Sequence, residues 1–260
     1  MAKSSKSEKS DRRQVIDDIR RKQKRADKRQ GMAIVGVCVV VALVIVGAAL
    51  YPKVRDMVND QKWKGKSVGE IGAAASVCGE ITEKEATGSG EHVPEGQQVD
   101  YTDAPPAFGA HWNVAGVAPA PIGDRFYTAD SRPELEQLIH NSEHGYTILW
   151  YDTTAADDAD QVSAMRAIAK IMDANDTNQR LKFKVAPWTK ADVKETGKSF
   201  PKGQHIAFTH WRVDRDATPD AEGNTPQYGA WQYCSEVSGA ALEKFMDKYP
   251  FTDAPEPYAY

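Results

Sequence analysis

The sequence is most informative at Leu138-Ile139-His140-Asn141-Ser142-Glu143-His144-Gly145, which is followed directly by Tyr146-Thr147-Ile148-Leu149-Trp150. The first stretch has a helical pattern that Gly145 can end, and the β-branched and aromatic residues after it predict a buried strand. On a helix, His140 and His144 lie four positions apart and face one side, with Glu143 beside them. Two imidazoles and a carboxylate can bind zinc or copper and can also act in acid–base chemistry. The stretch therefore predicts a helix-to-strand turn and a candidate site together.

The segments around this turn predict a compact domain. Asp130 or Ser131 can cap the helix, with Pro133 in its first turn. The elements predicted further along are an amphipathic helix capped within residues 152–158, strands at 181–185 and 204–213, and a helix at 238–249. Residues 79–96 carry glycines and several charges and are predicted as loop. The order strand, helix, strand, strand, helix predicts one α+β, or α/β-like, domain.

An apolar segment near the N-terminus predicts a membrane span. From Met32 to Leu50 every residue is uncharged and nearly all are apolar. At about 1.5 Å per residue, a helix of these residues covers roughly the 30 Å hydrocarbon core of a bilayer, and a buried core helix of that length would normally have a polar face. The alternative is a cleavable signal peptide with small residues at Gly47-Ala48-Ala49. Its basic and apolar regions would both be unusually long, so an uncleaved signal anchor is favoured.

The charges on either side of the apolar segment predict its orientation. Residues 1–30 carry twelve lysines and arginines against five acids, a net charge of +7, whereas the chain after the span carries 21 basic against 32 acidic residues, a net charge of −11. The positive-inside rule then places the N-terminus in the cytoplasm and the C-terminal part outside. The basic arm lacks interleaved aromatic residues, so we expect it to set topology and to contact lipid rather than nucleic acid.

The domain organisation follows from these features. We predict a basic cytoplasmic arm at 1–31, a transmembrane helix at 32–51, a stalk and loop region at 52–100, and an exterior α+β domain at 101–260. Cys78 and Cys234 lie in the predicted exterior part, where a disulfide can form and would close a loop of about 157 residues. Two buried thiols or an intermolecular bridge are the alternatives. An intramolecular bridge would tether Cys78 to the exterior domain and favours one domain over two.

A metal site is the sharpest chemical hypothesis. His111 could join His140, Glu143 and His144 in a set of three nitrogens and one oxygen suited to zinc or copper. The structural alternative is that Glu143 accepts hydrogen bonds from loop amides while His144 packs and donates to a backbone carbonyl. His-x-x-Glu-His is also the signature of inverzincin metallopeptidases, but those enzymes need both histidines within a sustained helix, and here a strand begins just after His144.

Other candidate chemistry is weaker. The alternation of the predicted strand puts His205 and His210 on opposite faces, and His92 lies in predicted loop. The sequence has no P-loop, no dinucleotide fingerprint, no Gly-x-Ser-x-Gly elbow and no Cys-x-x-Cys pair. These observations do not establish an enzyme.

The chain resembles the actinobacterial membrane-anchored proteins of domain of unknown function 3105. The resemblance depends on Pro105-Pro106-x-x-Gly109-x-His111-Trp112 and on Leu138-Ile139-His140-x-x-Glu143-His144-Gly145 before a strand, and it continues in the strand 206–211 and in Ala254-Pro255-Glu256. It covers roughly residues 70–257. This chain departs from the family pattern at Ala107, Phe108 and Ala110, where the family commonly has Thr, Ser and Pro, and at Arg212, where it usually has Gly. The resemblance implies an anchored exterior domain without an assigned activity.

Three hypotheses about function follow. The first is a non-catalytic binding or accessory module of the cell envelope, able to hold zinc or copper through His111, His140, Glu143 and His144. The second is a metal-dependent hydrolase or redox enzyme that uses the same residues, which would need an accessible cleft and a free coordination position. The third is a structural subunit of a membrane complex with a protein partner.

Overall fold

The computed structural model describes residues 4–173 and 177–259. The chain divides into two compact units, one up to Val58 and one from Asn59 onward. The first unit is made of helix α1 (Ser4–Lys62), whose last turn belongs to the second unit. The second unit holds all the strands and the remaining helices of the described chain.

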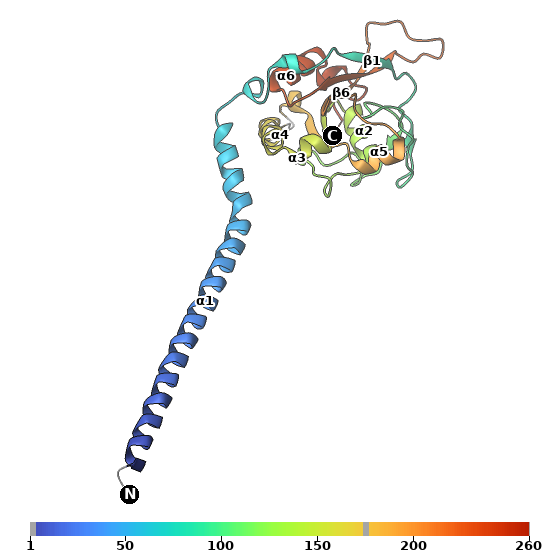
Figure 1. Cartoon of the computed structure of the whole chain (residues 1–260). Helices are drawn as coiled ribbons and strands as arrows, with labels where there is room; N and C mark the ends of the chain where they lie inside the picture. Colours follow the sequence, from blue (N-terminus) through green and yellow to red (C-terminus); the bar gives the residue numbers. More distant parts are fainter. Residues whose placement is uncertain (1–3, 174–176, 260) are drawn as a thin grey trace. The chain divides into compact units, whose positions relative to one another are not determined.

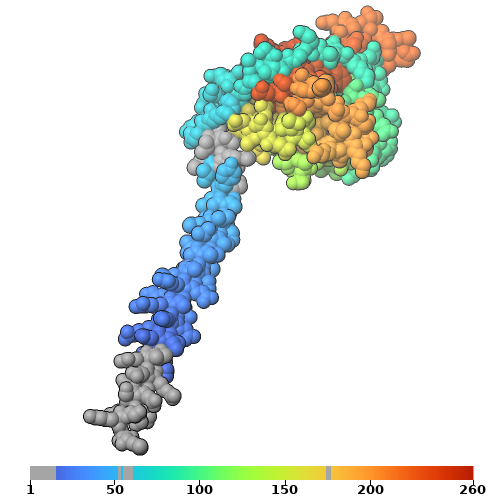
Figure 2. Space-filling model, in the orientation of Figure 1, coloured from blue at the N-terminus to red at the C-terminus, as the bar shows by residue number. Residues whose placement is uncertain are grey.

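Helix α1 contains the predicted apolar span. Among the described residues it is the one helix long and apolar enough to cross a membrane, within Ile16–Tyr51, and its most apolar window has a mean hydropathy of 3.0. The large apolar side chains of this part, such as Val37, Leu43 and Ile45, are exposed along the helix (Figure 2). Helix α1 continues beyond the apolar part to Lys62.

The second unit is built on a five-stranded mixed sheet with the strand order β1-β7-β6-β4-β5 (Figure 1). Its strands are β1 (Thr82–Glu85), β4 (Thr147–Tyr151), β5 (Phe183–Pro187), β6 (Ile206–Val213) and β7 (Gln227–Cys234). β4 and β5 run parallel, with α3 (Thr153–Asp157) and α4 (Ala159–Ile171) in the connection between them. β6 is antiparallel to β4 and to β7, and β7 is antiparallel to β1.

Helices cover both faces of this sheet. The side chains of β4 alternate between the two faces and contribute to two separate cores. Leu149 and Tyr151 belong to a core shared with α4 and with α6 (Gly239–Lys248). Ile148 and Trp150 belong to the core on the other face, which includes Leu138 of α2 (Leu135–Glu143). The expectation of a mixed α+β domain is thus confirmed, and α2 lies against the centre of the sheet.

Two short strands lie outside the main sheet. β2 (His92–Val93) and β3 (His111–Trp112) pair in parallel, with His92 opposite His111. The sequence predicts loop for residues 79–96, and this is wrong for β1 and β2. β1 is exposed and three of its four residues are charged, so its strand character comes from pairing with β7 rather than from its own hydrophobic pattern.

Several element boundaries also differ from prediction. α2 begins at Leu135 rather than near Pro133, with Glu134 as its N-cap and the Glu134 amide donating to the Gln137 side chain at 3.0 Å. β7 and α5 (Lys190–Thr196) are not among the predicted elements. The predicted disulfide between Cys78 and Cys234 is present. It joins the segment before β1 to the end of β7.

Candidate metal centre

The end of α2 positions three of the predicted site residues. His140 and Glu143 lie in its last turn and His144 is its C-cap residue, so the two histidines straddle the helix end as predicted. Gly145 then turns the chain into β4 with a φ of +88°, a conformation that favours glycine. A Cβ at Gly145 would lie 2.6 Å from the Phe251 carbonyl oxygen, so the turn is also packed closely.

The pairing of β2 with β3 brings two more histidines to this helix end. His111 is fully buried, whereas 44% of the His92 side chain is exposed. Sequence reasoning placed His92 in an uninformative loop and missed it, because only the pairing of the two short strands sets it beside His111. The two rings lie 4.9 Å apart between centroids.

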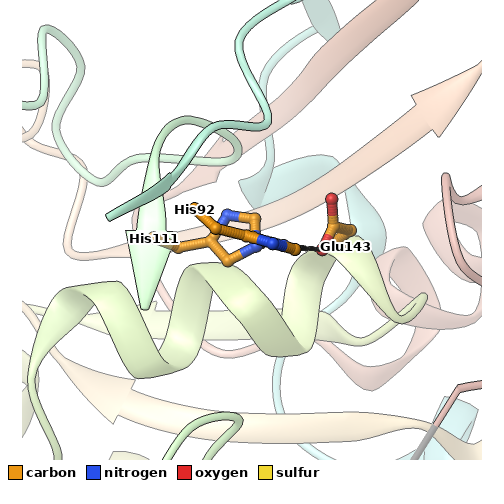
Figure 3. Close-up of side chains that lie close together, drawn as sticks. All are labelled: His92, His111 and Glu143. Carbon is orange, nitrogen blue, oxygen red and sulfur yellow. Dashed lines mark hydrogen bonds and ion pairs between the residues drawn. The ribbon is translucent and has the colours of Figure 1, made fainter. Parts of the chain in front are cut away.

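The first group of candidate ligands contains His92, His111 and Glu143. Figure 3 shows the two imidazoles directed toward the Glu143 carboxylate at the end of α2. Nε2 of His111 lies 2.9 Å from Glu143 Oε2, and Nε2 of His92 lies 3.6 Å from the same oxygen. One ligand atom from each of the three residues lies within 4.8 Å of the others.

The second group contains His140, Glu143 and His144, all buried, with ligand atoms again within 4.8 Å of one another. Nε2 of His140 lies 3.0 Å from Nε2 of His144. The four predicted ligands therefore lie in one cluster, but their ligand atoms fall into two groups. His111 belongs with His92, while His140 and His144 form a group of their own, and Glu143 is common to both.

Backbone carbonyls orient two of the imidazoles. Nδ1 of His111 donates to the Gly109 carbonyl at 2.9 Å, and Nδ1 of His140 donates to the Trp112 carbonyl at 2.6 Å. In a neutral imidazole only one nitrogen carries a hydrogen, so Nε2 of His140 carries the lone pair, whereas Nε2 of His111 donates to the Glu143 carboxylate at 2.9 Å. Histidines that bind metals in proteins are held in this way, by a second hydrogen bond from the ring nitrogen that does not face the metal.

His144 and Glu143 do not have the partners that a purely structural role predicts. Within the described chain, Nδ1 of His144 is buried without a hydrogen-bond partner. The close contacts of the Glu143 carboxylate are with imidazoles rather than with loop amides. The backbone amide of Glu256 donates to the Glu143 carbonyl at 2.9 Å, and this places the half-exposed Glu256 carboxylate 3.5 Å from Nε2 of His144.

Burial keeps the imidazoles of the second group neutral. It lowers the pKa of His140 to about 4, aided by the neighbouring His111, and lowers the pKa of His144 to about 4, aided by His140. Burial alone would raise the pKa of Glu143, but the hydrogen bond from His111 and the electrostatic attraction of that imidazole outweigh it and lower the pKa of Glu143. Neutral imidazole and ionised carboxylate are the forms that bind metal ions.

The other two histidines lie elsewhere. Nδ1 of His205 lies 2.8 Å from Asp152, and the buried His210 lies 2.8 Å from Asp253 through Nε2. As predicted, they do not form a pair. Each has a carboxylate partner of its own.

The fold and the site define a class: a mixed α+β domain, preceded by a long apolar helix, with a buried cluster of histidines around one glutamate. The chain belongs to the family described as "Protein of unknown function (DUF3105)", whose family model matches residues 92–260. No curated protein and no solved structure matches it significantly. The matched region begins at His92 and contains all five residues of the two groups.

Proposed function

We propose that this protein is a single-pass membrane protein of the cell envelope whose exterior domain binds zinc or copper through His111, His140, Glu143 and His144, joined by His92. The observation that supports this most directly is the orientation of His111 and His140. Both donate Nδ1–H to a backbone carbonyl and direct Nε2 toward other ligand atoms. A purely structural cluster would also be expected to pair Nδ1 of His144, which is buried without a hydrogen-bond partner among the described residues.

The anchor is proposed from the sequence of α1. Its apolar part has the length and composition of a membrane span, and its N-terminal arm is strongly basic. This combination supports a signal anchor with the α+β domain outside the cytoplasm, as in the actinobacterial proteins that the sequence resembles. A disulfide within that domain is consistent with an oxidising compartment.

A binding or accessory role is favoured over hydrolysis. His140 and His144 are almost fully buried, with exposed fractions of 3% and 4% for the two residues. Four cavities of 270 to 580 Å³ in the described chain are lined by residues outside the cluster. A hydrolase needs its metal beside a cleft that a substrate can enter.

The test is metal binding by the full-length protein in detergent, purified without a polyhistidine tag. After removal of metal with a chelator and dialysis against zinc, we expect the protein to retain zinc and His140→Ala to hold clearly less of it. His205→Ala is the matched control, because it removes an imidazole outside the cluster. Zinc contents that are equal, or zero, in all three proteins would refute the proposal.

A further inference from the structure

The cluster holds more ligands than one ion needs. Zinc in proteins is usually four-coordinate, whereas the cluster offers four imidazoles and the Glu143 carboxylate, with the Glu256 carboxylate beside His144. The additional ligands are not arranged around a single point. The histidines form one pair from β2 and β3 and another from the end of α2.

The two oriented imidazoles point to different places. Nε2 of His111 faces Glu143 Oε2, which Nε2 of His92 also approaches. Nε2 of His140 faces Nε2 of His144 instead. An ion held by His111 and His92 would therefore occupy a different position from an ion held by His140 and His144.

Glu143 is the residue common to both positions. Its ligand atom lies within 4.8 Å of those of His92 and His111, and likewise within 4.8 Å of those of His140 and His144. Carboxylate ligands bridge pairs of metal ions about 3.5–4 Å apart in two-metal sites. The two groups, each with two imidazoles and a share in one carboxylate, match that arrangement.

We propose that the cluster is a two-metal centre in which the Glu143 carboxylate bridges one ion held by His92 and His111 and a second ion held by His140 and His144. This inference depends on the proposed metal binding. It adds the number of ions, the role of Glu143 as a bridge, and His92 as a ligand.

The two positions differ in their surroundings. The first includes His92, whose side chain is 44% exposed, and lies at the solvent-facing side of the cluster. The second has two buried imidazoles, and the half-exposed Glu256 carboxylate is 3.5 Å from His144 Nε2 and can act as its outer ligand. Loss of His92 therefore removes one ion and leaves the residues of the second position intact.

The experiment measures zinc per chain by mass spectrometry in the tag-free, full-length protein. We expect two zinc ions in the wild type, one in His92→Ala, fewer than one in Glu143→Gln, and two in the control His205→Ala. His92 is exposed, so its variant tests the stoichiometry without disturbing the core, and circular dichroism checks the fold of Glu143→Gln. One ion in both the wild type and His92→Ala overturns the two-metal centre but leaves the proposed function standing. If the wild type binds no zinc, both the two-metal centre and the proposed function are refuted.

Cobalt substitution tests the bridge itself. Two Co²⁺ ions joined by a carboxylate are magnetically coupled, so the electron paramagnetic resonance signal per cobalt should be clearly smaller at two equivalents than at one. His92→Ala should give the uncoupled signal at every loading. A signal per cobalt that is equal at one and two equivalents in the wild type would show that the ions are not bridged and would overturn the role of Glu143.

Discussion

Nε2 of His140 and Nε2 of His144 lie 3.0 Å apart inside the protein. Because Nδ1 of His140 donates to the Trp112 carbonyl, the metal-free pair can share one proton, donated by His144. A further proton would place a buried cation in this pair, and a second would bring two buried cations into contact. The pair is therefore suited to a shared proton or to a metal ion, and this makes the metal-free protein sensitive to acid.

The first prediction concerns that sensitivity. In the unfolded chain each of these histidines takes up a proton near pH 6.5, whereas in the folded protein the pKa of each is lowered to about 4. Between these values the unfolded chain binds more protons, so stability that is present above pH 6.5 is lost as the pH falls toward 4. The slope is at most about 1.4 kcal/mol per pH unit for each histidine. Thermal unfolding of the chelator-treated protein should show a Tm that falls from pH 7 to pH 5. A Tm that is constant over this range would contradict the predicted acid sensitivity.

The second prediction concerns Lys182, which ties the C-terminal segment to the end of α2. Its Nζ donates to the carbonyls of His144, Pro257 and Ala259 at 2.8, 2.9 and 3.0 Å. We expect Lys182→Met to leave these carbonyls unpaired, to destabilise the domain by about 3 kcal/mol or more, and to accelerate hydrogen exchange in residues 251–259. Zinc affinity should fall, because the segment that carries Glu256 is held less firmly beside His144.

Lys184→Met is the matched control for this variant. Lys184 is also buried, but it donates to the carbonyls of Pro121 and Asp124, away from the C-terminal segment. It should lower stability while leaving exchange in residues 251–259 unchanged. If both variants accelerate hydrogen exchange in residues 251–259 equally, Lys182 does not specifically hold the C-terminal segment.

The sequence predicts those parts of the fold and site that depend on local pattern. The turn at Gly145 and the spacing of His140 and His144 are local, and both were predictable. Strand β1 was not predictable from the sequence, because its Thr-Glu-Lys-Glu segment forms a strand only by pairing with β7. His92 was missed for the same reason, since a two-residue pairing with β3 supplies its place in the cluster.

The third prediction concerns topology. If residues 32–51 cross the membrane with the basic arm in the cytoplasm, alkaline phosphatase fused to the C-terminus should be active, since it needs export, and the same reporter fused just before residue 32 should be inactive. Replacing the lysines and arginines of residues 20–29 by glutamine should weaken or invert this difference. Equal activity of the two fusions would contradict the proposed orientation. The protein should also remain in the membrane fraction after alkaline washing.

The fourth prediction concerns the disulfide. The bond between Cys78 and Cys234 closes a loop with a sequence separation of 156 residues, for which loop-entropy reasoning gives a stabilisation of about 5 kcal/mol. Reduction, or the double change of both cysteines to alanine, should therefore lower the denaturant midpoint substantially. Cys38→Ala is the control, because this thiol is free and exposed on α1. A midpoint unaffected by reduction would mean that β1 pairing alone holds this segment.

The fifth prediction compares two glycines that follow helices, Gly145 and Gly197. Both have a positive φ, +88° and +68°, so alanine at either position costs about 1 kcal/mol of backbone strain. A Cβ at Gly197 meets nothing within 4 Å, whereas a Cβ at Gly145 would lie 2.6 Å from the Phe251 carbonyl oxygen. We expect Gly145→Ala to destabilise the domain by at least about 2 kcal/mol more than Gly197→Ala in urea unfolding.

Because Gly145 follows His144 directly, Gly145→Ala should also lower zinc affinity, while Gly197→Ala should leave it unchanged. Equal destabilisation would mean that the backbone near Phe251 yields to the added methyl group and that the close packing at this turn does not hold the histidine cluster in place.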